Sequence, residues 1–133
     1  MLLTNKIDID TASINGQIDI LNWWIKSGLP LEYSTRALDL ASENGHIDVL
    51  NWWYDSGLEL RYTEVAIDSA SGENHTNVLD WWYNSGLKFK FSRYAIILAL
   101  EKDCRNSINW WKLYYLKKMP NFFDCENIEK LLY

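Results

Sequence analysis

The sequence predicts an all-α solenoid built from short helix-turn-helix units that repeat along the chain. Four adjacent tryptophan pairs stand 29 residues apart and use all eight tryptophans, at Trp23-Trp24, Trp52-Trp53, Trp81-Trp82 and Trp110-Trp111. A fixed period of this length, without insertion or deletion, is typical of stacked repeats. Asn-Gly and Ser-Gly pairs also recur at fixed places between helical stretches, where they mark the ends of helices.

Each unit begins with a short helix that is rich in alanine. In the second, third and fourth units we expect this helix over 35–42, 64–71 and 93–100. Alanines recur at positions i and i+4, as at Ala37 and Ala41, so they share one helical face. Small side chains let neighbouring backbones approach closely, which predicts that the first helices line the concave side of the stack. The residues that can cap these helices are Ser34, Thr63 and Ser92.

The second helix of each unit carries the tryptophan pair. It follows a turn such as Asn44-Gly45, and we expect it to run from about Ile47 to Asp55. Its apolar residues cover more than half of its circumference, which is typical of a helix packed between neighbours on both sides. Both rings of each pair are therefore predicted to lie in the core. About five extended residues with alternating polarity then lead to the next unit.

The last unit departs from the repeat. The units are expected at 1–33, 34–62, 63–91 and 92–120, within a single domain of residues 1–133. Tyr114-Tyr115-Leu116 replaces the Ser-Gly-Leu stop, so the last second helix is expected to continue to Lys118. Residues 121–133 are predicted to form a C-terminal capping helix over an otherwise open apolar face, which gives about four and a half repeats.

The unit resembles the second half of an ankyrin repeat. Residues 41–50 read A-S-E-N-G-H-I-D-V-L and are followed by a closing Ser56-Gly57, as in that family. The family's Thr-Pro-Leu-His opening is replaced by Arg36-Ala37-Leu38-Asp39, and the unit is about four residues shorter than the usual 33. The missing residues fall where the family has its projecting β-hairpin, so shortened β-hairpin fingers are expected.

The tryptophan-pair variant further resembles multi-repeat proteins of giant amoeba-infecting DNA viruses and of some lower eukaryotes. An abundance of asparagine, isoleucine, lysine and tyrosine fits an AT-rich genome and points the same way. The resemblance implies an ankyrin-repeat (ANK) protein that binds other proteins. For a viral protein it implies action on host proteins in the host cytoplasm.

Composition favours a single soluble domain without cofactors. The chain has 133 residues, of which 48% are hydrophobic, and no apolar stretch approaches the roughly 20 residues that span a bilayer. Two cysteines, Cys104 and Cys125, cannot form a disulfide framework or a metal site alone. Both are interpreted as reduced thiols of a cytoplasmic protein, with a Cys104–Cys125 bridge left open. We expect a monomer without membrane contact.

The net charge of −5 is unevenly distributed. Residues 1–80 carry thirteen acidic and four basic side chains, whereas residues 81–133 carry five acidic and nine basic ones. This asymmetry indicates different electrostatic partners at the two ends, or drift among solvated surface positions. A phosphate-binding groove needs basic residues that recur on one face, but the recurrent charges here are acidic. We therefore expect no nucleic-acid binding.

Neither the histidines nor the recurrent acids predict catalysis. His46 and His75 stand at one repeat position, which Cys104 fills in the last unit, and no nucleophile, second ligand or base recurs beside them. We interpret them as turn residues that bond to a neighbouring backbone. The tryptophans suggest an aromatic cage, but adjacent residues on a helix diverge by about 100°, so one pair cannot form it. The chain is predicted not to be an enzyme and to hold no cofactor or metal.

These observations predict a protein–protein interaction module that binds a partner through the concave face of the solenoid. The alternative is a structural spacer, or a fragment of a longer repeat array, with no partner of its own. Contacts to a partner are expected from exposed residues of the first helices and from the short fingers. These residues are Arg36, Asp39, Glu59, Arg61, Asp68, Lys88, Lys90, Arg93 and Ile97.

Overall fold

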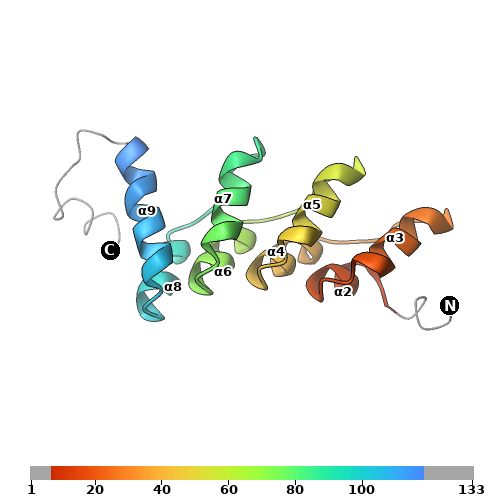
Figure 1. The fold of residues 1–133 in the computed structure, drawn as a ribbon, viewed down its shortest axis with the longest axis horizontal. Coiled ribbons are helices and arrows are strands. Elements are labelled where there is room, and N and C mark those ends of the chain that lie inside the picture. Colours follow the sequence, from red (N-terminus) through yellow and green to blue (C-terminus); the bar gives the residue numbers. More distant parts are fainter. Residues whose placement is uncertain (1–6, 119–133) are drawn as a thin grey trace.

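Figure 1 shows the computed structural model, which describes residues 7–118 as four helix pairs arranged in a row. The first helices of the pairs are α2 (Ile9–Ile14), α4 (Arg36–Glu43), α6 (Val65–Gly72) and α8 (Tyr94–Glu101). The second helices are α3 (Ile18–Ser27), α5 (Ile47–Ser56), α7 (Thr76–Asn84) and α9 (Arg105–Lys118). The predicted all-α class is confirmed over these residues, whereas the predicted capping helix at 121–133 lies outside them.

The segments between pairs are extended loops. Within residues 7–118 no strand forms, so the described part of the chain contains no β-hairpin finger. The expected alternation is present over 58–62, where Glu59 and Arg61 are exposed while Leu58, Leu60 and Tyr62 are buried or half-buried. Each loop therefore keeps an apolar edge against the helices and a polar edge toward solvent.

The first helices form a tight layer because their contact faces are made of alanine. Ala37, Ala41, Ala66 and Ala70 are at most 1% exposed. Each first helix packs closely against the next one, whereas the second helices touch their neighbours at only a few positions. In Figure 1 the second helices accordingly fan apart above a compact row of first helices. This difference in spacing bends the row toward the first helices, as the residue sizes predict.

The Ser-Gly stop of the second helices has a clear local cause. α5 ends at Ser56, whose hydroxyl donates to the Trp53 carbonyl at 2.6 Å and accepts from the Leu58 N–H at 3.1 Å. Gly57 follows with φ of 75°, a left-handed conformation that favours glycine. In α9 a tyrosine, Tyr115, occupies the equivalent position, and the helix continues to Lys118 as predicted.

In the last three pairs the second tryptophan is buried between repeats, whereas Trp24 is half-buried and its indole N–H donates to the Ile7 carbonyl at 3.0 Å. Trp53, Trp82 and Trp111 are at most 1% exposed. Each indole N–H donates to a serine hydroxyl in the first helix of the preceding pair, so that Trp82 bonds Ser42 at 3.0 Å and Trp111 bonds Ser71 at 2.8 Å. A buried indole N–H needs such a partner, because an unpaired one would carry the cost of its lost hydration.

The first tryptophan of each pair lies at the outer edge of the core and is only half-buried. Its indole N–H donates to a side chain of the preceding second helix, as from Trp52 to Asn22 Oδ1 at 2.9 Å and from Trp81 to Asn51 Oδ1 at 2.8 Å. The prediction that both rings lie in the core is thus right for Trp53, Trp82 and Trp111, and wrong for Trp24 and for the first ring of each pair. The divergence of adjacent residues on a helix separates the two.

A histidine of one repeat lies directly on a glycine of the repeat before it. A Cβ atom on Gly45 would be 3.1 Å from the His75 ring, and one on Gly16 would be 3.2 Å from the His46 ring. In the last repeat Cys104 takes the place of the histidine. In the repeat before it Asn74, whose φ is 62°, takes the place of the glycine. A thiol is smaller than an imidazole ring, so we expect it to leave room for the asparagine Cβ, and we expect the residues at the two positions to depend on each other. The expected hydrogen bond from the imidazoles is replaced by this ring contact.

We expect Trp82→Ala to lower the free energy of unfolding by roughly 3–5 kcal/mol, because the ring is fully buried and its loss leaves a cavity. Trp81→Ala should cost clearly less, since its ring is half exposed. Urea denaturation followed by circular dichroism measures both values. Equal losses in the two variants would contradict the separation into a buried and an edge tryptophan.

The coupling between the histidine and glycine positions can be measured with a double-mutant cycle. Gly45→Asn should cost about 1–3 kcal/mol through overlap with the His75 ring, although asparagine tolerates the left-handed conformation. Adding His75→Cys recreates the pairing found at Asn74 and Cys104, and it should recover a large part of that loss. Additive effects of the two substitutions would show that the positions are independent.

Candidate binding surfaces

The first residues of three neighbouring first helices form an exposed row, which we call the first-turn row. It consists of Arg36, Val65 and Tyr94, which begin α4, α6 and α8. Tyr94 is 58% exposed and Val65 44%, so both apolar side chains face solvent. Val65 and Tyr94 are not among the contact residues predicted from the sequence, although one signal pointed to them. Arginine, valine and tyrosine occupy the same repeat position, which indicates that no common packing role fixes the residue there.

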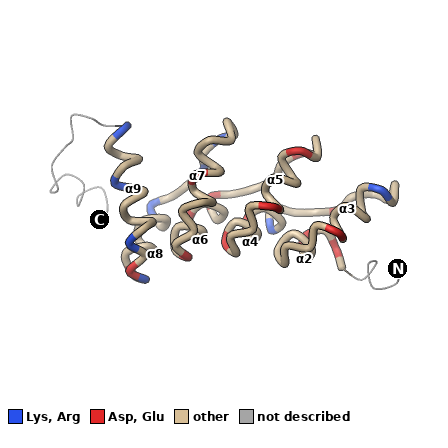
Figure 2. Tube along the Cα trace, viewed as in Figure 1, with Lys and Arg blue, Asp and Glu red and all other residues tan. Residues whose placement is uncertain are grey.

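Most of the residues predicted to contact a partner lie at the surface. Exposed members of the predicted set are Arg36, Glu59, Arg61, Lys88 and Arg93, whereas Lys90 and Ile97 are half-buried. Figure 2 shows that the charges differ along the row, with acidic residues on α5 and basic residues along α9. A partner that lies along the row would therefore meet opposite charges at its two ends.

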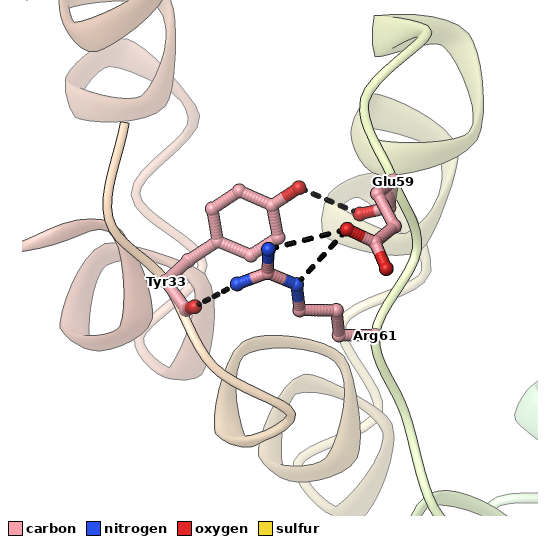
Figure 3. A network of polar contacts seen from close by, with 3 residues as sticks. All are labelled: Tyr33, Glu59 and Arg61. Carbon is pink, nitrogen blue, oxygen red and sulfur yellow. Dashed lines mark hydrogen bonds and ion pairs between the residues drawn. The ribbon is translucent and has the colours of Figure 1, made fainter. Parts of the chain in front are cut away.

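Arg61 joins two successive loops. In Figure 3 its guanidinium donates to the Tyr33 carbonyl at 2.9 Å and lies against the carboxylate of Glu59 at 3.2 Å. The same guanidinium is 4.7 Å from the centre of the Tyr33 ring, and the Tyr33 hydroxyl donates to the Glu59 carbonyl at 2.7 Å. Arg61 thus contributes to the framework while one side of it stays exposed.

Lys90 repeats this arrangement one unit later. Its ammonium donates to the Tyr62 carbonyl at 3.1 Å and lies 4.2 Å from the centre of the Tyr62 ring. The Tyr62 hydroxyl donates to the Lys88 carbonyl at 2.7 Å, and burial raises the pKa of that hydroxyl. Lys88 contributes only its backbone to this link, so its side chain remains available at the surface.

Asp39 and Asp68 are not exposed contact residues, which corrects the sequence prediction. They are 5% and 8% exposed. Thr63 donates its backbone N–H and its hydroxyl to the two carboxylate oxygens of Asp39, at 2.9 and 2.7 Å, and Ser92 binds Asp68 in the same way. The Thr63 hydroxyl in turn accepts from the Val65 N–H at 3.1 Å. Each aspartate therefore fixes the loop that starts the next first helix.

A wide groove opens on the opposite side, where the second helices fan apart. It lies between α5 and α7 and has a volume of about 770 Å³, within the size range of ligand sites. Its lining is Ile47, Asn51, Tyr54, Asn77, Asp80, Trp81, Asn84 and Ser85. A smaller groove of about 200 Å³ lies between α7 and α9. Helix geometry excludes an aromatic cage made by one tryptophan pair, but it does not predict the contact between rings of two repeats, Tyr54 and Trp81, in this groove.

The burial of Asp39 predicts a pH dependence of stability. Desolvation raises the pKa of Asp39 above its usual value, and this outweighs the hydrogen bonds from Thr63. The folded protein then holds the proton more tightly than the unfolded chain. The group's stabilising contribution is therefore present at low pH and is lost as pH rises through the raised pKa. The same direction holds for Asp68.

Comparison with Asp39→Asn isolates this contribution from that of the other acids. The free energy of unfolding of the unaltered chain, minus that of the variant, should fall as pH rises from about 3.5 to 6. Urea denaturation at several pH values gives this difference. A difference that rises with pH would mean that the hydrogen bonds from Thr63 outweigh the desolvation of the carboxylate.

Two kinds of feature were sought in the described residues, and the whole chain was compared with known proteins. Across residues 7–118 no three His, Cys, Asp or Glu side chains are grouped so that they could hold a metal ion. In the same range no helix has the length and apolarity needed to cross a bilayer. Comparison with protein-family models, with curated proteins and with solved structures found no match. What the chain binds must therefore be inferred from its own surfaces.

Proposed function

We propose that this chain is a protein–protein interaction module, an ankyrin-like solenoid that binds another protein through its concave face. That face comprises the first-turn row and the exposed edges of the loops. The observation that carries the proposal is the contrast between buried and exposed positions. Buried positions hold the same or a chemically similar residue in successive repeats, whereas the exposed first-turn row holds arginine, valine and tyrosine.

The chemistry of this face suits a protein partner. Tyr94 is 58% exposed and stands beside the exposed Arg93. Tyrosine and arginine are among the residues that contribute most to binding energy at protein interfaces. Repeat proteins commonly use the concave surface of the row for binding, with the specificity residing in residues that differ between units.

The charges on this face differ from one repeat to the next, so they would fix the orientation of a bound partner. Glu59 and Lys88 occupy the same loop position in successive repeats, and Glu64 and Arg93 the same position before the first helices. A partner would therefore present basic groups toward the start of α6 and acidic groups toward the start of α8. Charges arranged in this way set the orientation of a complex and speed its association more than they raise its affinity.

The resemblance to repeat proteins of giant amoeba-infecting viruses extends the proposal to a host protein as the partner, bound in the host cytoplasm. A spacer without a partner is the second candidate. It is favoured by the links between successive loops through Arg61 and Lys90, which join each repeat to the one before it. An interaction module needs its exposed residues to bind another protein, whereas a spacer does not.

Affinity capture with paired variants distinguishes them. Proteins retained by the immobilised chain should be lost with Tyr94→Ala and with Lys88→Glu, which alter exposed side chains without internal roles. Lys112→Glu is the control, because it makes the same charge change at an exposed position of α9 outside this face. Quantitative mass spectrometry measures the retained proteins. If no retained protein depends on Tyr94 or Lys88, the spacer is favoured and the interaction module is rejected.

A further inference from the structure

We propose that the groove between α5 and α7 binds a lysine or arginine side chain of a basic peptide segment, packed against the rings of Tyr54 and Trp81 beside Asp80. The inference rests on the proposed function in that its ligand is a protein. It concerns a different surface, however, because the groove lies among the second helices and not along the first-turn row.

Tyr54 and Trp81 form a right-angled aromatic corner from two different repeats. Their ring centres are 6.0 Å apart and their planes meet at 88°. Both rings are held in place, since the Tyr54 hydroxyl donates to the Ser85 carbonyl at 3.3 Å and the Trp81 indole donates to Asn51 Oδ1 at 2.8 Å. Aromatic faces attract an ammonium or guanidinium group within about 6 Å of the ring centre.

The next gap contains the equivalent pair of rings, with Tyr114 stacked on the tryptophan, and there a cation of this chain lies over the tyrosine. Tyr83 and Trp110 stand 29 residues after Tyr54 and Trp81, with ring centres 6.0 Å apart and planes at 83°. The Lys117 ammonium lies 5.9 Å from the centre of the Tyr83 ring. The chain thus supplies an internal example of the ligand that this corner accepts.

The end of the second helix decides which corner is open. α9 continues to Lys118 and so carries Lys117 over its gap. α7 ends at Asn84, and Lys88, the residue equivalent to Lys117, lies in the following loop. The groove between α5 and α7 is consequently the larger of the two, about 770 Å³ against about 200 Å³.

Charge selects a cation for the open corner. Asp80 is the single charged residue among those that line the groove between α5 and α7. One of its oxygens accepts from the Trp110 indole at 2.7 Å, so the carboxylate is positioned between the two gaps. An anionic ligand would be repelled by the Asp80 carboxylate and would find no basic partner in the lining.

Amide side chains favour a peptide as the carrier of the cation. Asn51, Asn77 and Asn84 line the groove from both helices. An indole N–H can only donate, so Trp81 must bond the side-chain oxygen of Asn51. The NH₂ group of Asn51 is then left to donate elsewhere. That group can bind a backbone carbonyl of an extended segment while a side chain of the segment enters the aromatic corner.

Titration of the ¹⁵N-labelled chain with a blocked glycine peptide that contains one lysine tests the site. The indole N–H signal of Trp81 should shift and saturate. The same peptide with norleucine in place of lysine should produce no such shift. Equal responses to the two peptides would overturn the proposal, because norleucine keeps the hydrocarbon stem and lacks the charge.

Two variants use residues that the chain already has at equivalent positions, which protects the fold. Tyr54→Ile introduces the residue found at Ile25, and Asp80→Asn introduces the residue found at Asn51. Tyr54→Ile removes an exposed cation–π contact and Asp80→Asn an exposed ion pair, and each should weaken lysine-peptide binding about two- to fivefold. Asp55→Asn removes the same charge outside the groove and should leave binding unchanged. A loss as large as that of Asp80→Asn would indicate unspecific attraction and reject the site.

Lys117→Met tests the internal example directly. In the unaltered chain the Trp110 indole signal should not respond to the lysine peptide, whereas in the variant it should respond, because the Tyr83 ring beside Trp110 then has no cation of this chain over it. A silent Trp110 in the variant would contradict the equivalence of the two corners. Tyr94→Ala should leave both titrations unchanged, so failure of the concave-face interaction and failure of this site can be told apart.

Discussion

The hydrogen bond from a buried tryptophan to a serine of the preceding repeat is the contact on which the rest of the structure depends. It joins residues 40 positions apart, as from Trp82 to Ser42, and it occurs at three successive interfaces. The ring fills the space between two repeats while its single polar group is satisfied there. A residue of this size and polarity can be placed in only one way, so the interval between tryptophans sets the interval between repeats.

Two layers of different thickness follow from this contact. Alanines bring the first helices together, whereas the tryptophans hold the second helices apart. The inner layer therefore becomes a rigid support for the loops, which the Asp39 and Asp68 carboxylates attach to the next helix. The outer layer keeps gaps between its helices, and those gaps become grooves lined by exposed aromatic and amide side chains. One packing choice thus generates both candidate surfaces.

Much of the fold could be predicted from the sequence because its signals are periodic or local. The tryptophan interval, the alanine faces and the missing stop at Tyr114-Tyr115-Leu116 identified the helix pairs and the longer α9. Features that join residues 24 to 31 positions apart could not be predicted in this way. Asp39 was placed at the surface because its partner Thr63 lies in the next unit, and the corner of Tyr54 and Trp81 depends on the spacing of two helices.

The contact between a histidine and the glycine of the preceding repeat limits how such a chain can grow by duplication. Unit 34–62 carries Gly45 and His46, so a tandem copy of it would again place a histidine on a glycine. Unit 63–91 carries Asn74 and His75, and a copy placed after it would bring a histidine ring onto an asparagine. The repeats are therefore alike in length but not interchangeable in order. A copy of either middle unit therefore does not fit between Asn74 and Cys104, because it would place a histidine ring on the asparagine.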